Sequence, residues 1–254
     1  MTKVVDRKVA LITGASRGIG AAIAKRLFAD VDVYLAANDT PENLANAVRA
    51  CLERRPDGRV ETGVFDFVQK GAAESMVAAA LVAFGRIDIL INNAAIRIRH
   101  PFGEFSHDDF DNMIMINLQA PMFASQAVVP IMRRQGGGRI IHIASQMGEI
   151  AEHGSTLYGM TKAALIHLTR SMAYELAPDK IIVNAVSPGP TMTEYNVERT
   201  TKNPRLKADK VLSTPAGRYG EPDEIAEVVE FLAKTNATYL LGHNLVVDGG
   251  YLIH

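Results

Sequence analysis

Short apolar runs alternate with longer amphipathic segments along the whole chain, and this alternation restricts the possible folds more than any other feature. The apolar runs are rich in isoleucine and valine, as expected of strands buried on both faces. Strands that alternate with helices form right-handed βαβ units, in which the strands are parallel and the helices cover the sheet. The sequence therefore predicts an α/β fold with a parallel sheet between two layers of helices.

The pattern places seven strands and six helices. We expect strands at Val9–Thr13, Val33–Ala36, Val60–Phe65, Ile87–Asn92, Arg139–Ser145, Ile181–Val186 and Asn244–Asp248. We expect helices near 18–29, 41–54, 70–84, 107–134, 158–177 and 222–233. No long linker interrupts this order, so residues 1–254 are predicted to form a single domain. The stretch 188–214 lacks a clear period, and long insertions of this kind are often lids over a functional site.

Composition and charge exclude several classes of partner. A net charge of -1 provides no basic field for nucleic acid. Cys51 is the only cysteine, so no intrachain disulfide and no thiol metal site are expected. No apolar stretch reaches the roughly 18 residues of a membrane span, and the first ten residues lack the apolar core of a signal peptide. We expect a cytoplasmic protein without a metal, a nucleic acid or a membrane as partner.

A glycine-rich turn follows the first expected strand. It reads Thr13-Gly14-Ala15-Ser16-Arg17-Gly18-Ile19-Gly20 and opens the first expected helix. Glycines there let the backbone approach a pyrophosphate, and the helix N-terminus offers free N–H groups and a partial positive charge. The spacing is G-x-x-x-G-x-G rather than the common G-x-G-x-x-G. Its place in a βαβ unit nevertheless predicts a dinucleotide site.

A serine, a tyrosine and a lysine form a second candidate constellation. Tyr158 and Lys162 are four residues apart in a helical segment and therefore share one helix face, while Ser145 ends the preceding strand. A phenol with a pKa of about 10 is too weak a base at neutral pH, but a nearby ammonium together with a positively charged nicotinamide lowers that pKa. Tyr158 would then exchange a proton with a ketone or alcohol oxygen that Ser145 holds. The Tyr-x-x-x-Lys pair alone is weak evidence, because an exposed helix pair has the same spacing.

Taken together, these motifs resemble those of the short-chain dehydrogenases/reductases over nearly the whole chain. The matching motifs are Thr13-Gly14-x-x-x-Gly18-x-Gly20, Asp66, Asn92-Asn93-Ala94-Ala95, Asn117, Ser145, Tyr158-x-x-x-Lys162, Pro188-Gly189 with Thr193, and Val247-Asp248-Gly249-Gly250. Their occurrence in this order is highly specific. The resemblance implies a Rossmann-like, doubly wound sheet of seven parallel strands and NAD(P) as cofactor. It also implies a small carbonyl or alcohol substrate and assembly as a homotetramer or homodimer.

The resemblance assigns roles to individual residues. Tyr158 corresponds to the general acid/base, Lys162 to the residue that lowers its pKa and holds the nicotinamide ribose, and Ser145 to the hydroxyl that orients the substrate. Asn117 corresponds to the residue that anchors a water behind Lys162. The residues expected at the cofactor are Gly14, Ser16, Arg17, Gly18, Ile19, Gly20, Asn38, Asp66, Phe67, Asn93, Ala94, Tyr158, Lys162, Pro188, Gly189, Thr191 and Thr193. The stretch 188–214 corresponds to the substrate lid.

The choice between NAD and NADP depends on the end of the second strand. NAD-specific relatives carry an acidic residue there, which binds the ribose 2′-OH. The likeness places Ala37 at that position, followed by Asn38 and Asp39. The missing acid and the presence of Arg17 favour NADP, although the basic residue often found at position 38 is absent.

Three segments are similar to the gluconate 5-dehydrogenase-like branch, which acts on sugar acids and polyols. These segments are Asn92–Phe102, Ser145–Met147 and Thr214–Gly220. The side chains expected near the substrate are Arg97, Arg99, His100, Gln146 and His153. The two arginines and His100 are suited to a substrate carboxylate, but a solvated loop or a subunit contact explains them equally well.

Two other functions share the same motifs. A 3-oxoacyl thioester (acyl-carrier-protein) reductase has the same tetrad and would accept long apolar acyl chains. A non-catalytic dinucleotide sensor has the same fold but no turnover. The intact tetrad of Asn117, Ser145, Tyr158 and Lys162 argues against the sensor.

Overall fold

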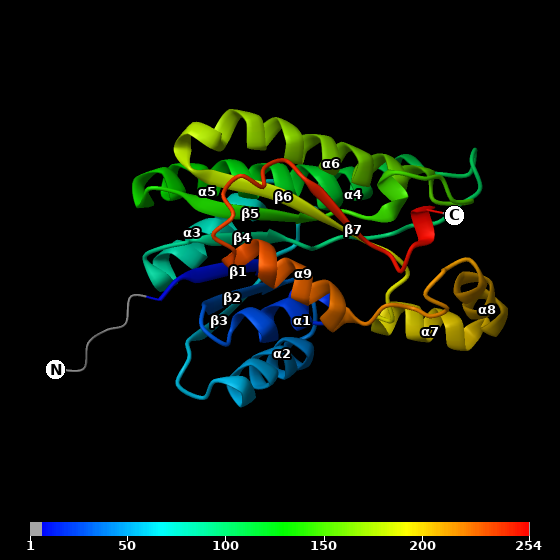
Figure 1. The fold of residues 1–254 in the computed structure, drawn as a ribbon, viewed down its shortest axis with the longest axis horizontal. Helices are drawn as coiled ribbons and strands as arrows, with labels where there is room; N and C mark the ends of the chain where they lie inside the picture. Colours follow the sequence, from blue (N-terminus) through cyan, green and yellow to red (C-terminus); the bar gives the residue numbers. More distant parts are fainter. Residues whose placement is uncertain (1–6, 254) are drawn as a thin grey trace.

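Seven strands form one parallel sheet in the order β3-β2-β1-β4-β5-β6-β7 (Figure 1). The computed structural model describes residues 7–253, so part of the N-terminal segment from which a cytoplasmic location is expected lies outside the described residues. The strands are β1 (Val9–Thr13), β2 (Asp32–Ala37), β3 (Val60–Val64), β4 (Ile89–Asn92), β5 (Gly138–Ile143), β6 (Ile181–Pro188) and β7 (Asn244–Val247). They differ from the predicted strands only at their ends. The predicted fold class is confirmed.

Helices cover both faces of this sheet (Figure 1). One layer contains α1 (Gly18–Leu27), α2 (Pro41–Arg54) and α9 (Pro222–Lys234). The other contains α3 (Ala72–Phe84), α4 (His107–Ile114), α5 (Ala120–Gln135) and α6 (Thr156–Leu176). The buried apolar side chains accordingly form two large clusters, one between the sheet and α1, α2 and α9, the other between the sheet and α3, α5 and α6.

Local hydrogen bonds fix where the helices begin. The Thr40 hydroxyl accepts a bond from Asn43 N at 3.2 Å, directly before α2. Before α4, Ser106 and Asp109 form a capping box, in which each side chain accepts from the other residue's backbone N–H, at 3.1 and 2.9 Å. Such bonds satisfy N–H groups that have no partner within the helix.

Two segments differ from the sequence prediction. The long helix expected at 107–134 is divided, because Met115–Gln119 forms a π-helical turn between α4 and α5. The stretch expected to lack a period contains two helices, α7 (Glu194–Lys202) and α8 (Pro204–Leu212), which lie beyond the carboxyl end of β6 (Figure 1). The first is mostly polar, and in the second the apolar residues are interspersed with charged ones without a helical period, so the pattern predicts neither helix.

The helical run His107–Gln135 is long and apolar enough, by length and composition alone, to cross a membrane. This finding corrects the expectation that no stretch passes such a test. The run is partly buried and contacts α3 and α6, as a core helix does. Within residues 7–253, no three His, Cys, Asp or Glu side chains are grouped to hold a metal ion.

Candidate active site

The candidate site lies where the strand order reverses, at the carboxyl ends of β1 and β4. Ligands of open parallel sheets bind outside the carboxyl ends of the strands at such a point. A cavity of about 790 Å³ is located here. Every residue that the sequence predicts at the cofactor lines this cavity, from Gly14 to Thr193. These residues come from the ends of five strands or the loops after them, and from α1 and α6, so the fold assembles them from most of the chain.

The glycine-rich loop after β1 fits a pyrophosphate. Gly14 and Gly18 have φ of 62° and 56°, in the left-handed region that glycine adopts without strain. A Cβ on Gly20 would lie 2.1 Å from Gly14 O, so the turn is too tight for a side chain. Arg17 precedes α1 without a capping hydrogen bond from its side chain, and the first N–H groups of α1 are therefore available to phosphate oxygens.

The loops after β1 and β4 are held against each other. Thr13 Oγ1 accepts hydrogen bonds from Asn93 N and Ala94 N, both at 2.9 Å. The Asn93 side-chain amide donates to Gly14 O at 3.0 Å. A Cβ on Gly14 would lie 2.9 Å from Ala94 Cα, which shows how closely the two loops approach. The two loops thus form one continuous wall of the cavity.

Asp39 lines the cavity just after β2 and beside the glycine-rich loop. Its carboxylate accepts hydrogen bonds from Ser16 Oγ at 2.6 Å, Asn43 Nδ2 at 2.9 Å and Thr40 N at 2.8 Å. Burial acts to raise the pKa of Asp39, but the hydrogen bonds outweigh it and lower the pKa. Arg17 Nε lies 3.4 Å from the same carboxylate. The Asp39 carboxylate therefore competes with any ligand at this end of the cavity for contacts with Ser16 and Arg17.

Ser145, Tyr158 and Lys162 all line the cavity. Ser145 follows β5, whereas Tyr158 and Lys162 lie one turn apart on α6. Lys162 is 2% exposed, and its Nζ donates a hydrogen bond to Ile143 O at 2.8 Å. Burial lowers the pKa of the Lys162 ammonium to about 7, because a medium of low dielectric disfavours the charged form. This lysine is thus able to take up and release a proton near neutral pH.

The groups that lower the pKa of Tyr158 in the structure differ from the one that the sequence predicts. Burial is the largest influence and raises the pKa of this phenol, while the charge of Arg97 and a hydrogen bond with Ser145 lower it. The Arg97 guanidinium carbon lies 5.0 Å from the centroid of the Tyr158 ring, and Lys162 Nζ lies 5.7 Å from it. The sequence assigned the lowering of this pKa to Lys162. Arg97 is a second cation at the ring, which no motif indicated.

Asn117 lies behind the cavity rather than in its lining. It is fully buried in the π-helical turn. Its side-chain oxygen accepts from Ile96 N and its amide donates to Ile96 O, both at 2.8 Å. The amide also lies 3.2 Å from Thr161 Oγ1 on α6. Asn117 therefore fixes the backbone next to Arg97 relative to the helix that carries Tyr158 and Lys162.

The residues predicted at the substrate divide into two groups. Arg97 and Gln146 line the cavity. Arg99 donates to His153 O at 2.8 Å, and His100 Nε2 lies 3.6 Å from Asp109 at the start of α4. Neither of these two residues belongs to the lining, and His153 does not either. The structure thus brings one arginine of the predicted basic cluster into the cavity.

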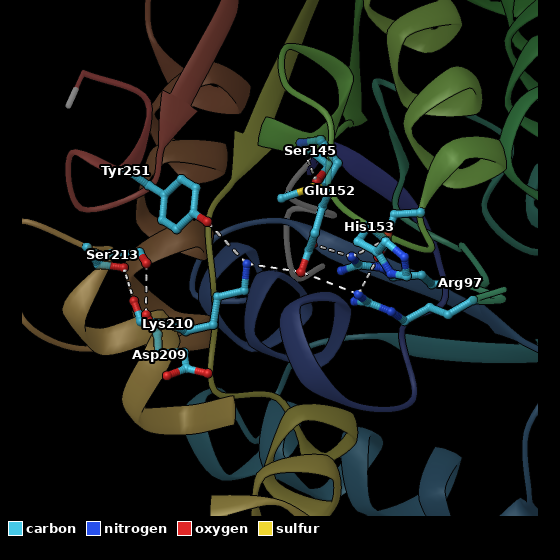
Figure 2. Close-up of polar contacts among 12 residues, drawn as sticks. Arg97, Ser145, Glu152, His153, Asp209, Lys210, Ser213 and Tyr251 are labelled. Carbon is cyan, nitrogen blue, oxygen red and sulfur yellow. Dashed lines mark hydrogen bonds and ion pairs between the residues drawn. The ribbon is translucent and has the colours of Figure 1, made fainter. Parts of the chain in front are cut away.

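Glu152 is a residue of this site that the sequence did not indicate (Figure 2). It lies in the loop before α6, and its carboxylate contacts Arg97 at 2.7 Å and Lys210 of α8 at 3.1 Å. Burial alone would raise the pKa of Glu152, but the charges of Arg97 and Lys210 lower it to about 2. Glu152 is separated from Arg97 by 55 positions and belongs to no motif, so only the folded chain shows the contact.

Comparison with known proteins agrees with this geometry. The family model described as Enoyl-(Acyl carrier protein) reductase matches residues 14–252. A 3-oxoacyl-(acyl-carrier-protein) reductase of Thermotoga maritima is 36% identical, over 98% of this chain and 99% of its own. Gluconate 5-dehydrogenase of Gluconobacter oxydans is 36% identical, over 96% and 94%. Among solved structures, a short-chain dehydrogenase/reductase from Serratia marcescens has a TM-score of 0.89 at 36% identity and covers 96% of this chain and 97% of its own.

Proposed function

This chain belongs to the short-chain dehydrogenase/reductase family of NAD(P)-dependent oxidoreductases, and on that basis we propose that it interconverts a carbonyl and a secondary alcohol on a small polar substrate, a sugar acid or a polyol. One observation carries the proposal. Ser145, Tyr158 and Lys162 line the same cavity as the glycine-rich loop after β1. The proton donor Tyr158 and the loop expected to bind the dinucleotide therefore line one cavity.

When bound, the cofactor would supply or accept the hydride, while side chains of the protein donate or accept the proton. In reduction, the Tyr158 hydroxyl donates its proton to the carbonyl oxygen of the substrate, and in oxidation its phenolate accepts the proton of the alcohol. Ser145 donates a hydrogen bond to the same substrate oxygen and holds it beside Tyr158. Lys162 would hold the cofactor ribose, and its pKa of about 7 lets its side chain take up and release a proton near neutral pH. Asn117 keeps these groups in place from behind.

The lining of the cavity supports a compact, polar substrate. Beyond Tyr158, charged and amide side chains face the cavity: Arg97, Gln146, Glu152, Arg199 and Lys210. Burying a long acyl chain against these groups would remove them from water without new hydrogen bonds, which is unfavourable. Hydroxyl and carboxylate groups of a sugar acid supply such bonds. The second candidate, a 3-oxoacyl thioester reductase, is supported by the 36% identity to the Thermotoga maritima protein.

NADP is the cofactor that we propose. Ala37 ends β2 without an acid that would bind the ribose 2′-OH. The Asp39 carboxylate already accepts three hydrogen bonds within the chain, so most of its acceptor positions are taken before that hydroxyl could bind. The Arg17 side chain is 65% exposed at the cavity and is able to turn towards a 2′-phosphate.

We also propose a cytoplasmic homotetramer or homodimer. Phe110, Met122 and Met160 are exposed on α4, α5 and α6, the layer that covers one face of the sheet. Exposed apolar side chains that share one face favour association with another protein surface. Light scattering on the purified protein would give the mass of two or four chains of 27.5 kDa if this is correct.

A substrate screen tests the proposal directly. Purified protein is incubated with aldonates, polyols and 3-oxoacyl thioesters, each with NAD(H) and with NADP(H), while the absorbance of the reduced nicotinamide is followed. We expect turnover of an aldonate or a polyol, with higher kcat/KM for NADP(H). Preferential turnover of the thioesters would identify the second candidate. A protein that binds the cofactor but transfers no hydride to any compound, even in a single turnover, would instead be a dinucleotide sensor.

A further inference from the structure

Cationic side chains from two separate parts of the chain contact the Glu152 carboxylate (Figure 2). Arg97 and Arg99, in the segment after β4, lie 2.7 and 3.4 Å from its carboxylate, and Lys210 of α8 lies 3.1 Å from it. The Glu152 side chain is only 17% exposed, so solvent screens these contacts little. One carboxylate therefore connects the segment beside the catalytic tyrosine to a helix of the expected lid.

On one side, Glu152 determines where the Arg97 guanidinium lies. Arg97 Nη2 donates to Glu152 and to Ser155 Oγ, both at 2.7 Å. In that position the guanidinium carbon is 5.0 Å from the centroid of the Tyr158 ring, within the range of a cation–π contact. Arg97 Nε is buried without a hydrogen-bond partner. The contacts of Nη2 therefore hold the guanidinium at the ring, with Glu152 providing the charge.

On the other side, Glu152 anchors α8. Lys210 Nζ contacts Glu152 and also lies 3.2 Å from the Tyr251 hydroxyl. Its side chain is 16% exposed, although α8 as a whole has no fully buried side chain. A helix with so little apolar burial gains little stability from packing. The polar contacts of Lys210 are thus a main attachment of α8 to the rest of the molecule.

We propose that Glu152 is a positioning residue that couples the lid to the acid/base: its carboxylate holds Arg97 against Tyr158 and, through Lys210, holds α8 over the same cavity. This inference rests on the proposed function, because it assigns the proton transfer to Tyr158. A lid that opens at Lys210 would leave Glu152 free to move, and Arg97 would lose its fixed place at the ring. Proton transfer would then be favoured only with the lid in place.

The charged and titratable groups around Tyr158 are few, which makes the effect measurable. Lys162 faces the ring from α6, Arg97 from the segment after β4, and Tyr195 from α7, while Ser145 after β5 is a hydrogen-bond partner. Above pH 8, the Lys162 side chain is mostly deprotonated and therefore neutral, since its pKa is about 7. Arg97 is then the remaining cation at the ring when Tyr158 titrates.

The pKa of Tyr158 tests the first half of the proposal without any substrate. The chain has seven tyrosines and no tryptophan, so tyrosinate absorbance, measured against the Tyr158→Phe protein, isolates the titration of Tyr158. We expect Arg97→Gln and Glu152→Gln each to raise this pKa by about half a unit or more, and the double variant to add nothing further. A purely electrostatic role of Glu152 predicts the opposite sign, because removing a negative charge lowers the pKa of a nearby phenol. A lowered or unchanged pKa in Glu152→Gln overturns the proposal.

Hydrogen exchange of the α8 amides tests the second half. We expect about threefold to fivefold faster exchange in Glu152→Gln and in Lys210→Met, and a smaller acceleration in Arg97→Gln, because a coupling between two sites is reciprocal. Glu149→Gln and Lys207→Met are matched controls, because both residues are exposed and lie on the same loop and the same helix. Unchanged exchange in Glu152→Gln, or equal acceleration in the controls, overturns the coupling. If Glu152→Gln does not fold, Glu152→Asp keeps the charge but shortens its reach, and the same shifts are expected.

Both measurements are made on the cofactor-free protein, so they separate this inference from the proposed function. Failure of the substrate screen would remove the catalytic meaning of Tyr158 but would leave the pKa and exchange results interpretable. Normal turnover with no shift in either measurement would instead remove the coupling and leave the enzyme assignment intact.

Discussion

Replacing Lys162 with methionine should abolish turnover and at the same time stabilise the fold. The ammonium is 2% exposed, and its pKa in the folded protein is about 7, against about 10.4 in an unfolded chain. Between these values the unfolded chain binds more protons, so the stability of the wild type rises with pH. The burial of this group destabilises the fold by about 4 kcal/mol at pH 7 and about 2 kcal/mol at pH 9. Methionine fills similar space and carries no charge.

Urea unfolding followed by far-ultraviolet circular dichroism measures this difference, with protein concentration held constant. The methionine leaves Ile143 O without its hydrogen bond, which costs about 1–3 kcal/mol, so we expect a net gain of about 1–3 kcal/mol at pH 7. The lost bond is the same at both pH values. The gain should therefore shrink by about 2 kcal/mol between pH 7 and pH 9, whereas Lys207→Met on exposed α8 should show no such trend. A difference that does not change with pH would refute the argument that Lys162 is buried at the expense of stability.

Three further changes test the site. Tyr158→Phe should reduce turnover to below about a tenth while the cofactor still binds, since proton transfer contributes about 10²–10⁴-fold; binding is followed by nicotinamide fluorescence, and greater residual turnover would contradict the assignment. Arg97→Ala should lower kcat/KM for neutral polyols through the raised pKa of Tyr158, and by a further factor of about 10–100 for substrates with a carboxylate; equal losses for both classes would argue against charge recognition. Ala37→Asp should shift the preference towards NAD, by supplying a 2′-OH acceptor and repelling a 2′-phosphate; a wild type that already binds NAD tenfold tighter than NADP would contradict the premise.

The sheet and most of its helices could be predicted because their patterns are local. The strand Ile181–Pro188 is buried throughout, and its run of apolar residues shows this in the sequence. The carboxyl ends of parallel strands meet at one edge, so the order of strands and motifs along the chain is enough to place Gly14, Ser145 and Pro188 in one site. The positions of the residues expected at the cofactor could be predicted in the same way, because they also follow the carboxyl ends of the strands.

The charge arrangement could not be predicted, because it depends on residues far apart in the sequence. Arg97 was a candidate for binding a substrate carboxylate, with a solvated loop or a subunit contact as the alternative, yet Glu152 and Ser155 already bind it. In the α8 helix that brings Lys210 to Glu152, apolar residues are interspersed with charged ones and give no periodic signal. The burial that raises the pKa of Tyr158 is likewise a property of the packed molecule, since desolvation depends on every element around the ring.

The π-helical turn at Met115–Gln119 makes this part of the enzyme sensitive to chain length rather than to residue identity. Such a turn accommodates one residue more than an α-helix of the same extent. Losing that residue would convert α4 and α5 into one regular helix and rotate α4 about its axis by about 100° relative to α5. Asn117 would then no longer face Ile96, and the contact between α4 and α6 would be broken. Single-residue deletions at 115–119 should therefore be tolerated far less than substitutions at its partly exposed positions, which gives a deletion scan a direct use in locating the limits of the catalytic framework.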